Sequence, residues 1–527
     1  MNEKELNSKI FSGTIWKFCE RIIAQGVSFV VSLILARLLM PEDYGAISVI
    51  NIFIAIADVF LSSGLNTALI QKKDASELEF NTIFYCNLIL GGIVYVVFFI
   101  AAPFIAEAYD TPILTTAMRV FALRLPISSF QSIQSAYVSR TMNFKKFFFA
   151  TTIGTIASAV VGIAMAYQGF GVWALIAQYL TNTIVNTFTL FTIVEWRPKL
   201  QFSFSAAKPL ISYGWKVMFT DLAGTICNNL GNLLIGYQYT TTDLAYYSRG
   251  KQLPLLIRNN LYTTLISVLF PGMSNVNDDF DHVKNISRKS IQVLSYVVFP
   301  MMVGMCVVAE PLTIVMYTEK WIAIVPYVQI VCVECILSVI GTITLQAIKA
   351  IGRSDIMLKM EFIKKPILIL SIIIAMRFGV TAIALTLPFN TFIDFIINGI
   401  ACQRLINYRL TEQVQDCSYA LISSIVMGLC VYLVSCFISN IYAVRESETS
   451  LYMLYSDKNK TCTDKYGVPS GKIYSTHKPH HPYKREEVER EIPESGSRGQ
   501  SRAFWAAPHT ESFSDSPARP ESSGQSC

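Results

Sequence analysis

Residues 81–106 read NTIFYCNLILGGIVYVVFFIAAPFIA, a run without a single charged side chain. A transmembrane α-helix needs roughly 20 consecutive apolar residues to cross the hydrocarbon core, so this stretch is long enough to span a bilayer. Similar runs recur from about Phe11 to Tyr442. They are too long and too continuous for barrel strands, which alternate with period two. The sequence therefore predicts an all-α polytopic membrane protein, because a helix satisfies its backbone hydrogen bonds within its own segment.

Composition supports this class. The 527-residue chain is 52% hydrophobic and 15% charged, whereas average soluble domains carry about 25% charged residues. The twelve cysteines are scattered, and most, such as Cys86 and Cys227, suit small core residues rather than a disulfide framework. Cys332 and Cys335 form a CxxC inside a predicted span. Since no second ligand pair lies nearby, we expect no metal or redox site there.

We predict thirteen spans joined by short connections, which makes one bundle without a large extramembrane domain. The predicted spans cover about residues 14–37, 45–70, 81–106, 113–136, 147–167, 170–194, 207–236, 243–270, 289–317, 322–348, 361–378, 379–402 and 417–441. One alternating set of loops holds most of the Lys and Arg residues, whereas the other set holds only Arg37, Lys320 and Arg377. Because basic loops stay in the cytoplasm, this asymmetry predicts a cytoplasmic N-terminus.

The chain contains a weak internal repeat. Residues 171–183, GVWALIAQYLTNT, match residues 379–391, GVTAIALTLPFNT, at an offset of 208, and Asn182 pairs with Asn390. Asp43 and Ser48 also pair with Asp243 and Ser248 at an offset of 200. The repeat predicts two parallel six-helix lobes, 1–203 and 204–410, around a central cavity, followed by one extra span at 411–442. Such lobes suit a transporter that rocks about its cavity. The two repeated asparagines either line the cavity or bond across helices.

From residue 443 the composition changes to Ser, Pro, Glu, Lys and Arg, with SPARPESSGQS near the end. We predict that residues 443–527 are a disordered tail, and that it is a truncated or frame-shifted end of the chain. His480 and His481 lie in this tail. As an isolated pair they do not predict a metal site.

Charged side chains inside spans cost roughly 2.5–3.5 kcal/mol each on insertion scales, so they are candidate functional residues. Cations outnumber anions among them, which suits an anionic substrate such as a diphosphate, because Arg binds phosphate oxygens bidentately and keeps its charge. The alternative is internal ion pairing. The candidate substrate-binding residues are Arg21, Arg119, Arg124, Lys216, Arg249, Lys251 and Arg258.

Three carboxylates, Asp58, Glu334 and Asp394, lie nearest to the middle of their spans. A carboxylate at that depth can take up a proton or bind Na⁺, which would couple transport to an H⁺ or Na⁺ gradient. Structural pairing is an equal alternative for each of them.

Enzyme motifs are missing from the sequence. There is no GxxxxGK[ST], HExxH or GxSxG, and His282 is the one His of the membrane part. We therefore expect a transporter without cofactor, metal or nucleic-acid partner, rather than an enzyme.

Residues 12–49, SGTIWKFCERIIAQGVSFVVSLILARLLMPEDYGAISV, resemble the opening of the polysaccharide and O-antigen flippases. These flippases belong to the multidrug/oligosaccharidyl-lipid/polysaccharide exporter superfamily. LARLLMPEDYG (35–45) is the most specific piece, and SSGLNTALIQKKD (62–74), AYYSRGKQLPLLI (245–257) and LQAIKAIGRSD (345–355) also look similar. The resemblance covers about residues 1–441. Such flippases usually have twelve or fourteen spans, whereas thirteen are predicted here.

The resemblance implies export of undecaprenyl-diphosphate-linked oligosaccharide from the cytoplasmic to the periplasmic leaflet of the bacterial inner membrane, in polysaccharide or lipopolysaccharide biosynthesis. It implies alternating access around a cationic cavity and contact with a polysaccharide polymerase. It marks Arg249 as a cavity residue, and Arg37, Pro41 and Gly45 as a structural turn.

Three alternatives remain. An ion-coupled drug antiporter of the same superfamily would favour an acidic cavity, because its drugs are mostly cationic, and the surplus of cations counts against it. A membrane glycan polymerase or ligase would need a large outer loop, whereas the predicted outer loops (107–112, 167–170, 237–243, 318–321) are short. A pure scaffold has no use for so many charges within its spans.

Overall fold

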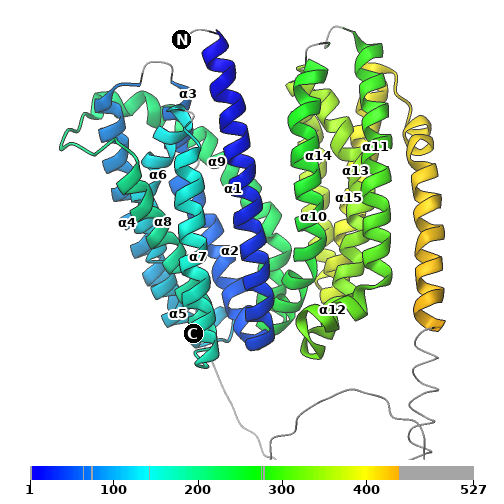
Figure 1. Ribbon diagram of the computed structural model, residues 1–527, viewed down its shortest axis with the longest axis horizontal. Coiled ribbons are helices and arrows are strands. Elements are labelled where there is room, and N and C mark those ends of the chain that lie inside the picture. Colours follow the sequence, from blue (N-terminus) through cyan, green and yellow to red (C-terminus); the bar gives the residue numbers. More distant parts are fainter. Residues whose placement is uncertain are drawn as a thin grey trace, which may run out of the picture. The chain divides into compact units, whose positions relative to one another are not determined.

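The computed structural model describes residues 3–62, 64–72, 75–141, 143–274, 276 and 279–437, which all belong to one compact unit, Met1–Ser447. All regular secondary structure within these residues is helical (Figure 1). The all-α prediction is therefore confirmed. The predicted tail at 443–527 and the last residues of the predicted final span lie outside the described residues.

The helices fall into a first group, a connecting helix and a second group. The first group consists of α1 (Glu3–Leu38), α2 (Pro41–Ser62), α3 (Gly64–Gln71), α4 (Glu77–Ala108), α5 (Ile113–Phe121), α6 (Arg124–Thr141), α7 (Lys145–Tyr167) and α8 (Val172–Ile193). The connecting helix is α9 (Phe204–Gln238). The second group consists of α10 (Thr241–Ser274), α11 (Phe280–Val307), α12 (Ala309–Tyr317), the 3₁₀-helix η1 (Glu319–Ile324), α13 (Val325–Ala350), α14 (Ser354–Ala375) and α15 (Val380–Ile406). A further helix, Leu410–Phe437, follows α15.

Each predicted span corresponds to helical residues, but four of the thirteen are divided. The predicted span 45–70 comprises α2 and α3, 113–136 comprises α5 and α6, and 289–317 comprises α11 and α12. The predicted span 322–348 begins in η1 and continues as α13, with Pro326 in the first turn of α13. Hydropathy over a long window averages across such short breaks, so it did not predict them.

Nine helices of the described part are long and apolar enough to cross a membrane. Helices α8, α9, α10 and α14 correspond to the other four predicted spans, and they carry more polar or charged side chains. Membrane crossing by these four helices stays a prediction.

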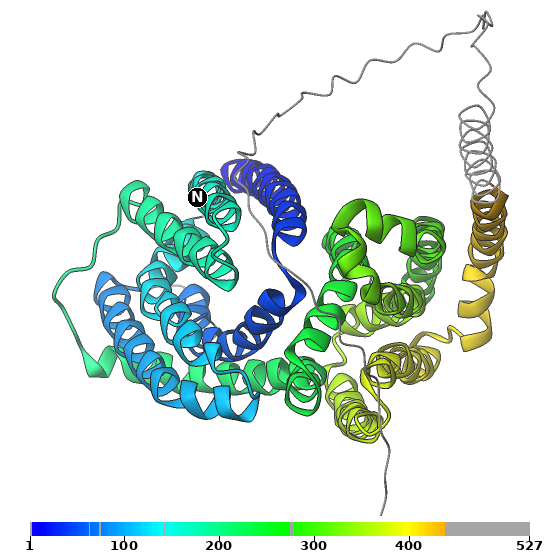
Figure 2. The same ribbon diagram turned by 90° about the horizontal axis from the view of Figure 1, so that it is seen from below.

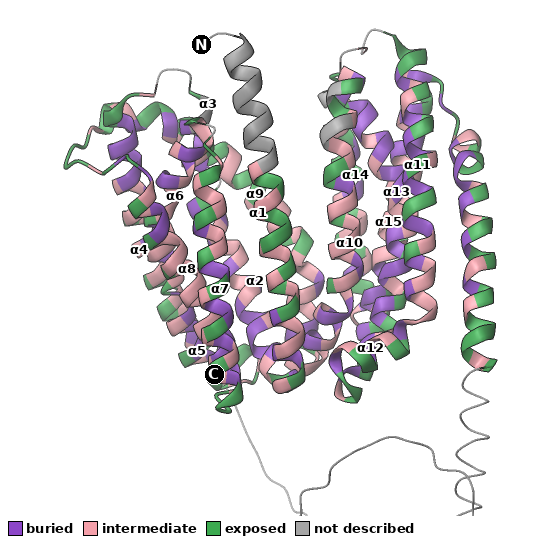
Figure 3. Ribbon diagram, in the orientation of Figure 1, coloured by how far each residue is buried: buried purple, intermediate pink, exposed green. Residues whose placement is uncertain are grey.

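Large apolar side chains are exposed on the outer surfaces of the helices, including Phe104, Phe188 and Phe362. Figure 3 shows that exposed positions recur along the whole length of the helix Leu410–Phe437 and not only at its ends. A surface this apolar requires lipid around it, because soluble monomers rarely expose large contiguous apolar patches.

The two groups of helices are seen side by side in Figure 2, which looks along the helix axes. They meet where α2 contacts α10 and where α1 contacts α12, and the connecting helix α9 also packs on α10. Gly45 lies at the contact of α2 with α10, and a Cβ atom on Gly45 would overlap the carbonyl oxygen of Thr241 at the start of α10. The glycine of the sequence motif MPEDYG is therefore what lets α2 approach α10 so closely.

Helix bounds recur at the offsets of the sequence repeat. Helix α1 ends at Leu38 and α9 ends at Gln238, while α2 begins at Pro41 and α10 at Thr241. Asp43 accepts a hydrogen bond from the Met40 backbone N–H at 3.2 Å, and Asp243 accepts one from the Thr240 N–H at the same distance. The division into two parallel six-helix lobes with bounds at 203 and 410 stays a proposal.

The helix Leu410–Phe437 is anchored by the buried carboxylate of Asp416. This carboxylate accepts hydrogen bonds from Tyr408 Oη (2.8 Å), Arg288 Nε (2.8 Å) and Gln292 Nε2 (2.9 Å). Because Arg288 and Gln292 belong to α11, these bonds join the last described helix to the second group.

Candidate functional site

A polar pocket of about 430 Å³ lies where the two groups of helices meet. Helices α1, α2, α7 and α8 line it from the first group, and α10 lines it from the second. We call it the Arg249 pocket, because Arg249 is the one charged residue among the described residues that line it. Its volume is within the range of about 300–1,000 Å³ found for ligand pockets.

Helical periodicity brings the lining side chains onto one face of each helix. Ser28, Ser32 and Leu35 follow i, i+4, i+7 on α1, and Tyr44, Ser48 and Asn51 follow the same spacing on α2. The other lining residues are Val31, Ile47, Thr155, Ser158, Leu175, Gln178, Tyr179, Asn182, Ser248, Arg249 and Gln252. Each helix thus turns a mainly hydroxyl- or amide-bearing stripe toward the pocket.

Arg249 is held by an aromatic ring and an amide. Its Cζ lies 4.0 Å from the ring centroid of Tyr44 and 5.9 Å from that of Trp321, and Nη1 donates to Gln252 Oε1 at 2.5 Å. The side chain is only 9% exposed, and no ion pair joins it to a carboxylate of the described residues. Arg249 therefore offers a cation to an anionic ligand.

One buried hydroxyl group of the pocket lacks a partner. The Oγ of Ser32 has no hydrogen bond within the described residues, whereas the Oη of Tyr44 lies close enough to interact with the Arg249 guanidinium. A buried polar atom without a partner costs about 1–3 kcal/mol, so such atoms are rare unless a ligand or water completes them.

Three other candidate cations lie outside the Arg249 pocket and have partners. Arg124 Nη2 pairs with Asp58 Oδ2 at 3.0 Å, and Arg258 Nη1 pairs with Glu334 Oε1 at 2.6 Å. Lys251 Nζ donates to Asn232 Oδ1 at 2.9 Å. Internal ion pairing thus occurs for Arg124 and Arg258, whereas the partner of Lys251 is uncharged, and the role of all three in substrate binding stays a proposal.

The remaining candidates lie elsewhere. Arg119 stacks on Phe99, with Cζ 4.2 Å from the ring centroid, and Nε donates to the Phe99 carbonyl at 3.2 Å. The exposed side chains of Arg21 and Lys216 make no hydrogen bond or ion pair with the described residues. Arg21 precedes Ser28 of the pocket by two turns on the same face of α1.

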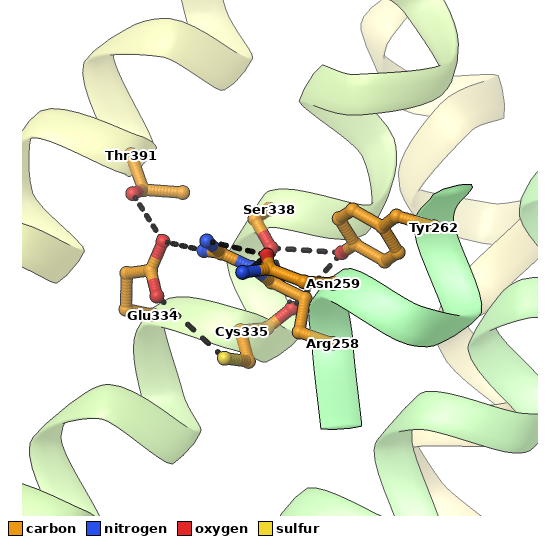
Figure 4. Close-up of polar contacts among 7 residues, drawn as sticks. All are labelled: Arg258, Asn259, Tyr262, Glu334, Cys335, Ser338 and Thr391. Atoms are coloured by element: carbon orange, nitrogen blue, oxygen red, sulfur yellow. Dashed lines mark hydrogen bonds and ion pairs between the residues drawn. The ribbon is translucent and has the colours of Figure 1, made fainter. Parts of the chain in front are cut away.

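The candidate carboxylate Glu334 belongs to a buried network in the second group (Figure 4). Its Oε1 accepts from Arg258 at 2.6 Å and from Thr391 Oγ1 at 3.4 Å. Tyr262 and Ser338 share a hydrogen bond of 2.8 Å beside it. The network joins α10, α13 and α15.

Asp394 differs from Glu334 in exposure. Its side chain is 48% exposed and its Oδ1 lies 3.5 Å from Lys364 Nζ, which also donates to Asn398 Oδ1 at 2.6 Å. The described residues contain no cluster of three or more His, Cys, Asp or Glu side chains suited to a metal ion.

Sequence reasoning missed the uncharged lining residues Tyr44, Asn51, Gln178 and Tyr179, because it searched the spans for charge. The usable signal was the i, i+4, i+7 spacing of polar residues within apolar helices. The sequence left two alternatives for Asn182, lining the cavity or bonding across helices, and Asn182 lines the pocket. Asn390, its partner in the repeat, lies outside the Arg249 pocket and is bonded to Ser371 at 3.0 Å.

A polytopic helical bundle with a polar pocket between two groups of helices is an architecture that membrane transporters use. The chain belongs to the family described as polysaccharide biosynthesis protein, whose model matches residues 34–326. The resemblance noted in the sequence is therefore confirmed.

Curated relatives agree with this family. The lipopolysaccharide biosynthesis protein WzxC of Escherichia coli K12 is 25% identical over 400 residues, which cover 74% of this chain and 81% of WzxC. The succinoglycan biosynthesis transport protein ExoT of Rhizobium meliloti 1021 is 24% identical over 317 residues, which cover 60% of this chain and 64% of ExoT.

The fold is similar to that of a solved structure, the lipid II flippase MurJ in an inward closed conformation. The TM-score is 0.63 at 14% sequence identity, and the match covers 82% of this chain and 99% of the MurJ chain. At this identity the likeness establishes the fold alone.

Proposed function

We propose that this protein moves undecaprenyl-diphosphate-linked oligosaccharide from the cytoplasmic to the periplasmic leaflet of the bacterial inner membrane, with its N-terminus in the cytoplasm. The observation that carries the proposal is the Arg249 pocket, which has one cation and otherwise mostly uncharged polar groups between the two groups of helices. Such a pocket offers a partner to a diphosphate and to sugar hydroxyls, and WzxC and ExoT are named for polysaccharide synthesis and transport.

In the proposed mechanism, Arg249 binds the diphosphate and the glycan enters the space between the groups. The prenyl chain stays in the bilayer beside the helices, since burying it in a polar pocket would be unfavourable. The two groups then rock about their contact at α2 and α10, and the pocket opens to the other side. A polysaccharide polymerase in contact with the transporter would take up the delivered units.

Asp58, Glu334 and Asp394 remain the candidates for coupling to H⁺ or Na⁺. Glu334 and Asp58 are each paired with an arginine, so using either requires that its ion pair opens. Asp394 is about half exposed and its Lys364 contact is longer, so it is the most accessible of the three.

The drug-antiporter alternative has less support, because the pocket holds a cation and no carboxylate among the described residues lines it. A cationic drug would face Arg249 without a counter-charge.

The test is lipid analysis of cells that lack the protein, with leaflet assignment on spheroplasts by an impermeant sugar-oxidising reagent. We expect complete lipid-linked units to accumulate on the cytoplasmic face. A normal leaflet distribution would contradict the proposal, and unpolymerised units on the outer face would point to a polymerase. Arg249→Ala should reproduce the accumulation with normal membrane insertion, whereas the matched control Arg119→Ala, whose arginine stacks on Phe99 outside the pocket, should accumulate far less.

A further inference from the structure

The wall of the Arg249 pocket that the first group of helices forms has a chemistry of its own. Arg249 belongs to α10, whereas the uncharged polar residues of this wall belong to α1, α2, α7 and α8. We propose that this wall is a binding subsite for one uncharged sugar ring, namely the ring attached directly to the diphosphate that Arg249 holds. The inference rests on the proposed function and names the part of the substrate that the pocket binds.

Unpaired hydrogen-bonding groups are the first support. Ser32 Oγ is buried, and neither it nor the carboxamides of Asn51 and Gln178 make a hydrogen bond with the described residues. A carboxamide presents both donors and acceptors, as a sugar hydroxyl does. Since these groups surround one cavity, one polyhydroxylated ligand can complete several of them at once.

Asn182 adds a carboxamide whose hydrogen bond within the protein a ligand can replace. Its Nδ2 donates to Ser158 Oγ over 3.4 Å, a long hydrogen bond for an amide donor. The carboxamide can exchange this bond for one to a ligand at little cost.

Tyr179 contributes an aromatic surface. Its ring is 38% exposed, and Phe121 supports it edge-on with ring centroids 5.4 Å apart. The supported ring lies among the lining residues and offers a rigid apolar surface to the C–H groups of a sugar.

Charge selects against acidic and basic sugars. Among the described residues no carboxylate and no second cation lines the pocket. Because the diphosphate engages Arg249, a charged ring on this wall would lose hydration without gaining a counter-charge from a side chain. The pocket volume of about 430 Å³ suits one ring and a diphosphate, and the rest of an oligosaccharide extends out of it.

The experiment measures binding of three short probes to the purified full chain in nanodiscs: citronellyl diphosphate, the same lipid carrying one glucose, and the same lipid carrying one glucuronic acid. We expect the glucose probe to bind about tenfold more tightly than bare citronellyl diphosphate, as about 1.4 kcal/mol of hydrogen bonding implies. The glucuronic acid probe should bind no more tightly than the bare lipid.

Single substitutions test which residues bind the glucose ring. Gln178→Ala and Asn182→Ala should abolish the gain from glucose, measured in each variant as the ratio of the Kd of bare citronellyl diphosphate to the Kd of the glucose probe. The matched control is Asn390→Ala, at the corresponding repeat position and likewise bonded to a serine, which should keep the gain. Ser32→Ala should weaken binding of the glucose probe without lowering the melting temperature, because it removes an unpaired buried hydroxyl.

Two results would overturn the subsite alone: equal binding of the bare and glucose probes, or equal loss of the gain in Asn390→Ala. If none of the three probes bound the wild-type protein, both the subsite and the function on which it rests would fail.

Discussion

The indole Nε1 of Trp321 donates a hydrogen bond to the backbone carbonyl of Ala36 at 2.8 Å. This bond joins η1 of the second group to the last turn of α1. Lys320 Nζ adds bonds to the carbonyls of Arg37 (2.7 Å) and Leu39 (2.6 Å), and Arg37 Nε donates back to the Met316 carbonyl of α12 at 3.0 Å. Each helix end thus has its unpaired carbonyls capped by side chains from the other group.

Trp321→Phe tests this capping. The ring of Trp321 is fully buried, so phenylalanine keeps most of the packing and removes the one donor to Ala36. The carbonyl left without a partner should lower the free energy of unfolding by about 1–3 kcal/mol. Thermal unfolding followed by circular dichroism measures the loss.

The control for this prediction is Trp16→Phe. Trp16 packs on Phe148 with ring centroids 5.1 Å apart, and its side chain makes no hydrogen bond with the described residues. An equal loss of stability in both variants would show that the ring, rather than the hydrogen bond, accounts for the effect.

Gly45→Ala should destabilise the protein by about 1–3 kcal/mol, because the added methyl group overlaps the Thr241 backbone and backbone cannot rotate away. Gly26→Ala is the matched control, since nothing lies within 4 Å of a Cβ at that position. That control should stabilise α1 by up to about 1 kcal/mol. The melting temperatures of the two variants measure this difference in stability. Equal values would contradict the close packing of α2 on α10.

The ion pair of Arg258 and Glu334 should behave as a buried pair. Their side chains are 20% and 11% exposed, so Glu334→Gln leaves Arg258 without its counter-charge and should cost about 3–5 kcal/mol. The double variant Arg258→Gln/Glu334→Gln should cost less than the sum of the single variants. Additive losses would show that the two side chains do not interact.

The reference for this cycle is the exposed pair of Lys365 and Glu361, whose side chains are 38% and 48% exposed. Solvent screens such a pair, and a double-mutant cycle there should give about 0–1 kcal/mol.

Variants of Arg124 and Asp58 distinguish two roles of Arg124, namely ion pairing with Asp58 and direct binding of the substrate. If Arg124 serves mainly to neutralise Asp58, the variant Arg124→Gln/Asp58→Asn should transport better than Arg124→Gln alone, because neither charge is left unpaired. We expect this recovery in the spheroplast leaflet assay. A double variant as defective as the single one would instead support direct contact of Arg124 with the substrate.

The sequence by itself determined the class and the helices of this protein. Runs such as 81–106 are long, apolar and uncharged, and a bilayer leaves such a run no alternative to a helix that pairs its own backbone groups. That constraint is local, so every predicted span has a helical counterpart among the described residues. The turn that MPEDYG predicted lies at Leu39 and Met40, whereas Gly45 itself belongs to α2. The short breaks, such as the one between α5 and α6, depend on a few residues. Hydropathy averaged over a window as long as a span therefore did not predict them.

Which charges pair and which face the pocket was decided only by the tertiary structure. Arg258 and Glu334 are 76 residues apart and Arg124 and Asp58 are 66 apart, so no periodicity within one helix brings them together. The same applies to Asn51 and Gln178, which are ordinary polar residues until α2 and α8 turn them toward one cavity. Helix formation follows from local hydropathy, whereas the pocket follows from the packing of five helices, which no single stretch of sequence encodes.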